Sequence, residues 1–201
     1  MTDPIRVYTP YTPAPAAATI ALSAAILALW GGAVVFASEA GLLRLLQPLQ
    51  VAALVASGIA LPAAAYALSP RLRNLVAWIG LRRLTIFHAW RIPAGLAFLW
   101  YGAHGELPLT FALLAGIGDV LAGAIALWAA QGPQTRSRYW FAHSFGMVDF
   151  IVAVGTGLTF TMLQDPAMDT IRTLPMSLIP MFGVGLSGAT HIMALHMLSR
   201  R

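Results

Sequence analysis

The chain has 201 residues, of which 59% are hydrophobic and only 9% are charged, whereas a typical soluble domain has about 45–50% apolar and about 25% charged residues. With a mean hydropathy of +0.76, the composition excludes soluble enzymes, secreted disulfide scaffolds and disordered tails, and it predicts a polytopic membrane protein. All twelve basic residues are arginine and seven residues are acidic, which gives a net charge of +5. The absence of cysteine excludes iron–sulfur clusters and thiolate zinc sites.

The expected elements begin with a proline-rich segment, residues 1–15, which we expect to lie on the membrane surface. A single transmembrane domain, 16–201, follows it and makes the predicted fold an all-α, polytopic helical bundle of about six spans. Each span must be long enough, at about 1.5 Å per residue, to cross a hydrocarbon core of about 30 Å. Residues 70–83 form a predicted amphipathic helix in the interface before the third span. The predicted spans are approximately 16–37, 49–68, 84–104, 110–130, 139–162 and 175–198.

The distribution of arginine predicts the orientation. With a cytoplasmic N-terminus, nine of the twelve arginines fall on the cytoplasmic side, and only Arg44 and Arg172 fall on the far side. Cytoplasmic loops carry an excess of basic residues, so both termini are expected in the cytoplasm of a bacterium, with the chain in its inner membrane. No basic patch interleaved with aromatic residues remains, so nucleic acid is not an expected partner.

Four ionisable residues within the spans form the predicted functional cluster: Arg91, Asp119, Asp149 and His191. A charged group at a helix centre costs about 2.5–3.5 kcal/mol on insertion scales, so its presence needs a reason. Each residue shares a helix face with small neighbours, which predicts that the four meet where spans three to six contact one another. His88, Thr156 and Ser187 are secondary polar candidates for the same site.

The charges of this cluster do not balance, because Arg91 faces two carboxylates. The excess negative charge predicts that the cluster binds a proton near neutral pH. We therefore expect proton-linked handling of a small solute or ion, with Asp119 and Asp149 as proton or cation acceptors, Arg91 as anion anchor and His191 as a titrating gate. The alternative is that Arg91 only bridges the two aspartates to lock the bundle.

Haem is a second alternative, because His88, His143 and His191 all lie toward the cytoplasmic side. Axial ligation of a b-type haem requires His88 or His143 to face His191 across a cavity of haem size. His143 lies about 120° around its helix from Asp149, so we expect it to face another way, near the headgroups. No other metal-ligand set and no nucleophile is apparent, so an enzyme is not favoured.

The haem alternative gives the chain a second candidate function. It would be an accessory or haem b-bearing subunit of a larger respiratory or photosynthetic membrane complex. The first two predicted spans carry no buried charge, so they and the N-terminal segment would form the docking surface for other subunits. The lipid bilayer is the other expected partner.

From Arg91 onward the chain resembles a family of small bacterial multi-spanning membrane proteins to which no activity is assigned. The similarity is carried by the helix containing Arg91, by ELPLTFALLAGIGDVLAG around Asp119, by GMVDFIVAVGTG around Asp149, and by TLPMSLIPMF followed by His191. It covers about half of the chain and implies that these four residues belong together. The family pattern has Pro where Leu114 stands and Asn where His143 stands, and it does not include His88.

Overall fold

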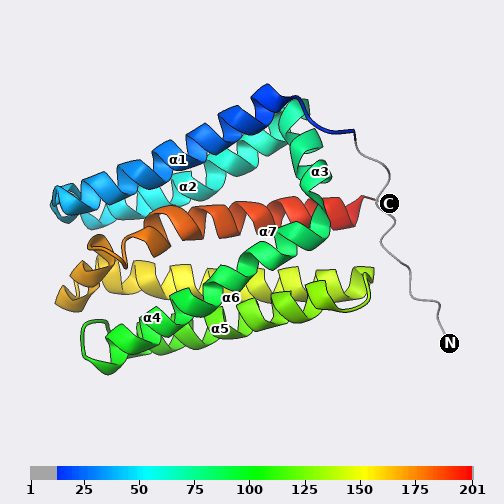
Figure 1. Cartoon of the computed structure of the whole chain (residues 1–201). Helices are drawn as coiled ribbons and strands as arrows, with labels where there is room; N and C mark the ends of the chain where they lie inside the picture. Colours follow the sequence, from blue (N-terminus) through cyan, green and yellow to red (C-terminus); the bar gives the residue numbers. More distant parts are fainter. Residues whose placement is uncertain (1–12, 201) are drawn as a thin grey trace.

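The computed structural model describes residues 13–200, and residues 1–12 of the expected N-terminal surface segment lie outside this range. The described chain is all-α and contains no strand (Figure 1). Four short helical turns connect or precede the long helices. Three are 3-10 turns, η1 (Leu42–Leu45), η2 (His88–Trp90) and η3 (Pro166–Arg172), and the fourth is a π-helical turn, η4 (Ile179–Gly183). The long helices are α1 Ala17–Glu39, α2 Pro48–Leu68, α3 Pro70–Phe87, α4 Arg91–Ala103, α5 Leu109–Gln131, α6 Arg136–Met162 and α7 Val184–Ser199.

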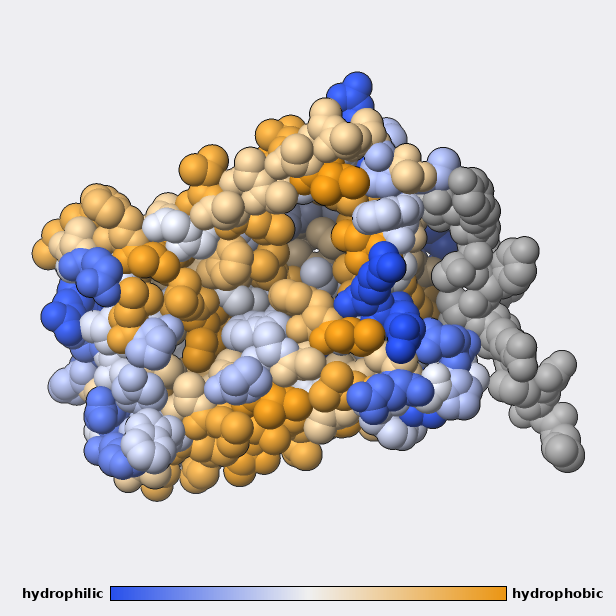
Figure 2. Space-filling view, viewed as in Figure 1, coloured by the Kyte–Doolittle hydropathy of each residue, from blue (hydrophilic) through white to orange (hydrophobic). Residues whose placement is uncertain are grey.

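Within residues 13–200, five helical segments are long and apolar enough to cross a membrane: α1, α2, α5, α6 and the continuous stretch of η4 and α7, Ile179–Ser199. Figure 2 shows hydrophobic residues covering the middle of the visible face and hydrophilic residues gathered at its two ends. Leu29, Phe36 and Leu61 are among the large apolar side chains exposed on this bundle. Such exposure suits contact with lipid, so the structure agrees with the expectation of a helical membrane protein.

The third expected span, 84–104, is not one regular helix. It consists of the end of α3, the turn η2 and the 13-residue helix α4, which follow one another along a single path (Figure 1). Pro93 explains the turn, because proline lacks the N–H that would bond to the carbonyl of Ala89 and its ring clashes with that carbonyl. The chain responds by tightening into a 3-10 turn immediately before α4.

The predicted interfacial helix 70–83 corresponds to the first part of α3. This part ends at Gly80, whose φ of 79° and ψ of 155° interrupt the helix. A side chain is strongly disfavoured in that backbone region, which glycine occupies without steric cost. Figure 1 shows the first part of α3 running across the end of the bundle before the chain turns toward α4.

The helices pass back and forth along the bundle. In Figure 1, α1, the path from the end of α3 to α4, and α6 run in one direction, and α2, α5 and α7 run in the other. The tightest crossing is that of α4 and α5, where a β-carbon added to Gly95 would lie 2.5 Å from the carbonyl oxygen of Gly116. The small face of α5 allows this approach, as the sequence predicts. Its buried residues include Ala112, Gly116, Asp119, Gly123, Ala126 and Ala130.

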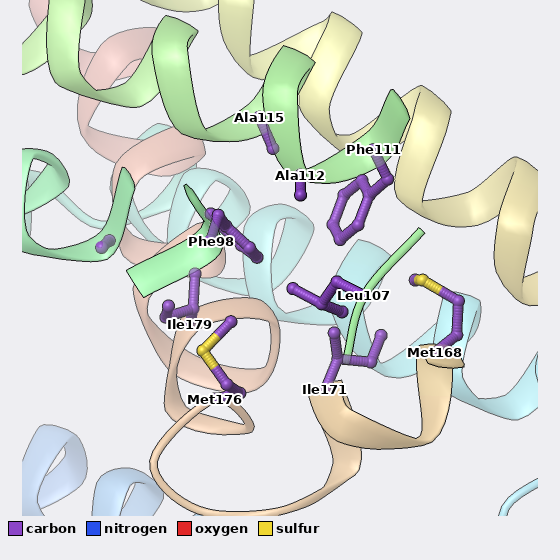
Figure 3. Close-up of a cluster of buried hydrophobic side chains, with 10 residues drawn as sticks. Phe98, Leu107, Phe111, Ala112, Ala115, Met168, Ile171, Met176 and Ile179 are labelled. Atoms are coloured by element: carbon purple, nitrogen blue, oxygen red, sulfur yellow. The ribbon is translucent and has the colours of Figure 1, made fainter. Parts of the chain in front are cut away.

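The connection between α6 and α7 is fixed to the bundle by an apolar cluster at one end of α5. Figure 3 shows Phe98 and Phe111 close to Ile171 and Ile179, which belong to this connection. The rings of Phe98 and Phe111 meet edge to face with their centroids 5.3 Å apart, an arrangement that aromatic pairs favour. This packing holds η3 and η4 against α4 and α5, and so positions the start of α7.

Candidate functional site

Three charged side chains form one contact group in the interior, here named the ion triad: Arg91, Asp119 and Asp149. The guanidinium Nε of Arg91 donates to Oδ1 of Asp119 at 2.6 Å, and its Nη2 pairs with Oδ2 of Asp149. The third nitrogen, Nη1, donates to the carbonyl oxygen of Gly146 at 3.2 Å. The side chains of Arg91, Asp119 and Asp149 are 2%, 10% and 8% exposed. A single guanidinium therefore serves two largely buried carboxylates.

Two glycines allow the ionisable groups to come together. A β-carbon on Gly118 of α5 would overlap the carboxylate of Asp149, so the absence of a side chain lets this carboxylate reach α5. A β-carbon on Gly146 of α6 would lie 2.7 Å from Nε2 of His191 and 3.4 Å from Nη1 of Arg91. Gly146 thus marks the place where the imidazole of His191 comes closest to the ion triad.

A cavity of about 210 Å³, here named the central cavity, lies against one side of the ion triad. Arg91 and Asp119 line it, together with Trp90 and Ser187. The indole Nε1 of Trp90 donates to the hydroxyl of Ser187 at 3.1 Å. Apolar residues of α2, α5, α6 and α7 form most of the remaining wall, so the cavity is an apolar space with charged groups on one side.

The central cavity adjoins the surface between two helices. Ala56 on α2 and Leu158 on α6 line it and are also exposed, which places an opening between these two helices. Thr161 lines both the central cavity and a charged groove that contains Arg44 and Asp169. The opening between α2 and α6 gives a small molecule a lateral approach to the central cavity, and the buried Thr161 separates the cavity from the charged groove.

Three buried histidines, here named the histidine cluster, lie beside the ion triad: His88 from η2, His143 from α6 and His191 from α7. None is more than 2% exposed. Nδ1 of His143 and Nδ1 of His191 are 3.0 Å apart, and the rings of His88 and His191 stack with centroids 3.8 Å apart. One nitrogen from each ring lies within 4.8 Å of the other two. The hydroxyl of Thr85 lies 3.0 Å from Nε2 of His143.

The structure places the predicted site residues as follows. It brings Arg91, Asp119 and Asp149 into direct contact, with His191 adjacent to them across Gly146. Of the secondary candidates, His88 stacks on His191, and Ser187 lines the central cavity. Thr156 does not join them, because its hydroxyl donates to the carbonyls of Val152 and Ala153 within its own helix.

The expectation that His143 faces the headgroups is wrong, because its side chain is 1% exposed and contacts His191. The buried face of α6 is wide enough to include both His143 and Asp149, since α6 packs on α5 along one side and on α7 along the other. An angle of about 120° between two residues separates an inner from an outer face only when a helix has a single neighbour.

The histidine cluster leaves no gap for a haem between its rings as they stand. The rings of His88 and His191 are in contact, and those of His143 and His191 are joined at Nδ1, so a porphyrin could enter between them only if the rings moved apart. Ligation of haem by His88, His143 or His191 stays the alternative hypothesis.

Sequence reasoning assigned no role in the site to three residues of this region: Thr85, Trp90, and Gly146, which it identified only as a small neighbour on the face of Asp149. Spacing gave a clue for two of them, because Thr85 precedes His88 by three residues and Gly146 follows His143 by three, so each pair shares a helix face. For Trp90 the sequence gave no clue, since tryptophan at a helix end also fits an anchor in the membrane interface.

The comparisons with known proteins leave the function open. No curated protein and no solved structure matches the chain. The model of one protein family, described as a domain of unknown function (DUF8737), matches residues 48–199, which include α2 to α7 and thus every residue of the ion triad and the histidine cluster. The chain belongs to this family of domains of unknown function.

Proposed function

We propose that the protein handles a small solute or ion in a proton-linked way, with the ion triad as the exchange site. The observation that carries the proposal is the position of Asp119, which pairs with Arg91 and also lines the central cavity. An ionisable residue inside a membrane protein marks a functional site by default, and one that borders a cavity is accessible to a ligand.

The charges of the triad supply the link to protons. Arg91 contributes one positive charge, and Asp119 and Asp149 contribute two negative charges when both are ionised, which leaves a net charge of −1. In a medium of low dielectric constant this excess is costly, so the site gains from taking up a proton or a cation. Asp119 is the acceptor, because its carboxylate is the one that borders the cavity.

The central cavity indicates the kind of solute. Its volume of about 210 Å³ is many times the roughly 10–15 Å³ that a single water requires on this measure, so a small organic molecule fits. Its walls are apolar except near Arg91, Asp119, Trp90, Ser187 and Thr161. The proposed solute is therefore mostly apolar, with one polar or cationic end that meets Asp119. The opening between α2 and α6 admits such a molecule from the lipid.

The proposal includes a topology of six spans in a bacterial inner membrane, with both termini in the cytoplasm. The sixth crossing is the path from Leu81 to Ala103, which runs the length of the bundle alongside α5. The arginine-rich first part of α3, the start of α6 and the end of α7 lie at one end of the bundle (Figure 1). Their shared location fits a single arginine-rich cytoplasmic face.

The substitution Asp119→Asn tests the proposal, because the amide resembles a protonated carboxyl group. The groups that face Asp119 are Arg91 and Asp149, with His88 and His191 beyond them. Proton uptake by the folded wild type removes its excess negative charge, so the triad should contribute more stability as the pH falls from about 8 to about 5. The histidines add an opposite dependence that wild type and variant share, so the difference between the two curves isolates Asp119.

We expect Asp119→Asn to fold and to lose the triad's pH-dependent contribution to the thermal midpoint in mild detergent. The control is Glu106→Gln, which neutralises an exposed carboxylate outside the cavity and should leave the wild-type pH profile intact. If Asp119→Asn melts the bundle at every pH and no pH-dependent difference remains, the triad is only a structural brace and the proposal fails.

A further inference from the structure

We propose that His88, His143 and His191 bind one transition-metal ion of the kind that imidazole prefers, with zinc(II) as the representative. Three separate elements supply the ligands, and each side chain is at least 98% buried. Imidazole nitrogens suit zinc, copper, iron(II) and nickel, and three histidines leave a further coordination position open. This inference does not depend on the proposed function of the ion triad.

The spacing of two ring nitrogens suits a shared ion. Nδ1 of His143 and Nδ1 of His191 are 3.0 Å apart. Two imidazole ligands at about 2.0–2.1 Å from a tetrahedral zinc ion lie roughly 3.3 Å from each other. The two nitrogens therefore need to separate by only a few tenths of an ångström, and the rings must turn so that both lone pairs meet at the ion. The proton between them must leave Nδ1 of His191 and move to its Nε2, which has no hydrogen-bond partner within the described residues.

Thr85 fixes the ligand atom of His143. The hydroxyl of Thr85 donates to the carbonyl oxygen of Leu81 at 2.8 Å, so its oxygen accepts from Nε2–H of His143 at 3.0 Å. A neutral imidazole carries one N–H, so Nδ1 of His143 carries a lone pair directed at His191. Metal-ligating histidines are usually held in this way, with the nitrogen remote from the metal hydrogen-bonded to a second residue.

Thr190 makes a longer and weaker contact with His88. The hydroxyl of Thr190 donates to the carbonyl oxygen of Leu186 at 2.7 Å, so it accepts from Nε2–H of His88 at 3.4 Å. Nδ1 of His88 is then a buried lone pair, and within the described residues neither it nor Nε2 of His191 has a hydrogen-bond partner. Buried polar atoms are rarely left unpartnered, and a bound ion would give the Nδ1 lone pair of His88 its partner.

Binding of the metal ion depends on the stacking of His88 and on the charges of the ion triad. The ring of His88 stacks on that of His191, so it must turn out of the stack to direct Nδ1 at the ion. Its hydrogen bond to Thr190 is long, so this turn loses little. Arg91 repels a cation, but Asp119 and Asp149 outweigh its charge, and the net negative charge of the ion triad offsets the charge of the metal.

The experiment measures metal in the full chain purified in mild detergent. We expect about one equivalent of metal by elemental analysis and, after chelation, a visible ligand-field spectrum when cobalt(II) is added as a probe. His143→Asn should abolish both. The control His104→Asn changes an exposed histidine that bonds to the carbonyl of Trp100, and it should bind metal like the wild type.

Thr85→Val keeps all three ligands and removes only the hydroxyl that orients His143. Loss of such a partner weakens metal binding by about 10–100-fold, so we expect a shift of that size in the zinc(II) dissociation constant. This variant also carries the test if His143→Asn fails to fold, with the zinc-induced rise of Tm as the readout. Asp119→Asn keeps all three ligands and should still bind the metal, although more weakly, because it removes a negative charge near the ion. Metal binding that persists in this variant separates this proposal from the function proposed for the triad.

Two results would overturn the proposal. In the first, the wild type contains no more metal than His143→Asn and shows no cobalt spectrum. In the second, His104→Asn lowers metal binding as much as His143→Asn does, which would mean that the metal binds at the surface.

Discussion

Replacing Arg91 with methionine tests how much the ion triad contributes to the stability of the protein. The substitution keeps an unbranched side chain and removes the guanidinium, which contacts two carboxylates and one carbonyl. Asp119 and Asp149 would then face each other, largely buried and without a counter-charge. We expect a large loss of stability, since an uncompensated buried charge costs far more than an unmade surface contact.

The magnitude follows from the number of charges left unpaired. Removing one partner of a buried ion pair typically costs about 3–5 kcal/mol. Arg91 serves two carboxylates, but one of them can take up a proton, so we expect about 3–5 kcal/mol in total. Adding Asp119→Asn and Asp149→Asn to Arg91→Met should restore much of the loss, because the amides carry no charge and the three positions are coupled.

The measurement is the free energy of unfolding in mixed micelles at neutral pH. Arg44→Met serves as the control, because Arg44 pairs with Asp169 at 3.3 Å but the two side chains are 58% and 49% exposed. Exposed ion pairs contribute about 0–1 kcal/mol, so this variant should stay close to wild type. The reasoning is refuted if Arg91→Met costs no more than Arg44→Met, or if the added asparagines recover nothing.

Three further predictions concern topology, cofactor and packing. Tags at residue 1, at residue 201 and near Arg136 should report the cytoplasm, and tags near Glu106 or Asp165 the periplasm; a periplasmic C-terminus would show that the path from Leu81 to Ala103 does not cross the membrane. The purified chain should show no Soret absorbance, and stoichiometric haem that disappears on substitution of His88, His143 or His191 would establish the haem alternative. Gly95→Val should destabilise the protein by about 1–3 kcal/mol or more in the same unfolding assay, because its β-carbon would lie 2.9 Å from the backbone nitrogen of Val120. The control Gly155→Val should be nearly neutral, since Gly155 has open space around it. Equal effects of the two variants would contradict the close α4–α5 crossing.

The long helices could be predicted from the sequence because lipid exposure demands continuous apolar segments. The expected span 49–68 and the helix α2, Pro48–Leu68, differ by one residue at the start. The third span shows the limit of this reasoning. Hydropathy reports whether a segment suits lipid, but it does not report the local hydrogen-bond pattern that Pro93 changes, and so it could not distinguish a regular helix from α4 preceded by a 3-10 turn.

The ion triad and the histidine cluster differ in how well the sequence predicts them. Arg91, Asp119 and Asp149 stand out because charge in an apolar helix is costly, and this cost leaves few arrangements other than mutual contact. Neutral histidine carries no such cost, so His143 could occupy an interface or a core with equal ease. Only the packing of α6 between α5 and α7 decides the matter, and that information is spread over three helices.

The turn η2 connects the two groups of side chains. His88 and Trp90 reach toward α7, where they meet Thr190 and Ser187, while Arg91 reaches between α5 and α6. Residues so close in sequence serve different neighbours because the 3-10 turn winds more tightly than an α-helix and changes the angle between successive side chains. The histidine cluster and the ion triad therefore share one structural support, and a change in this turn would displace both together.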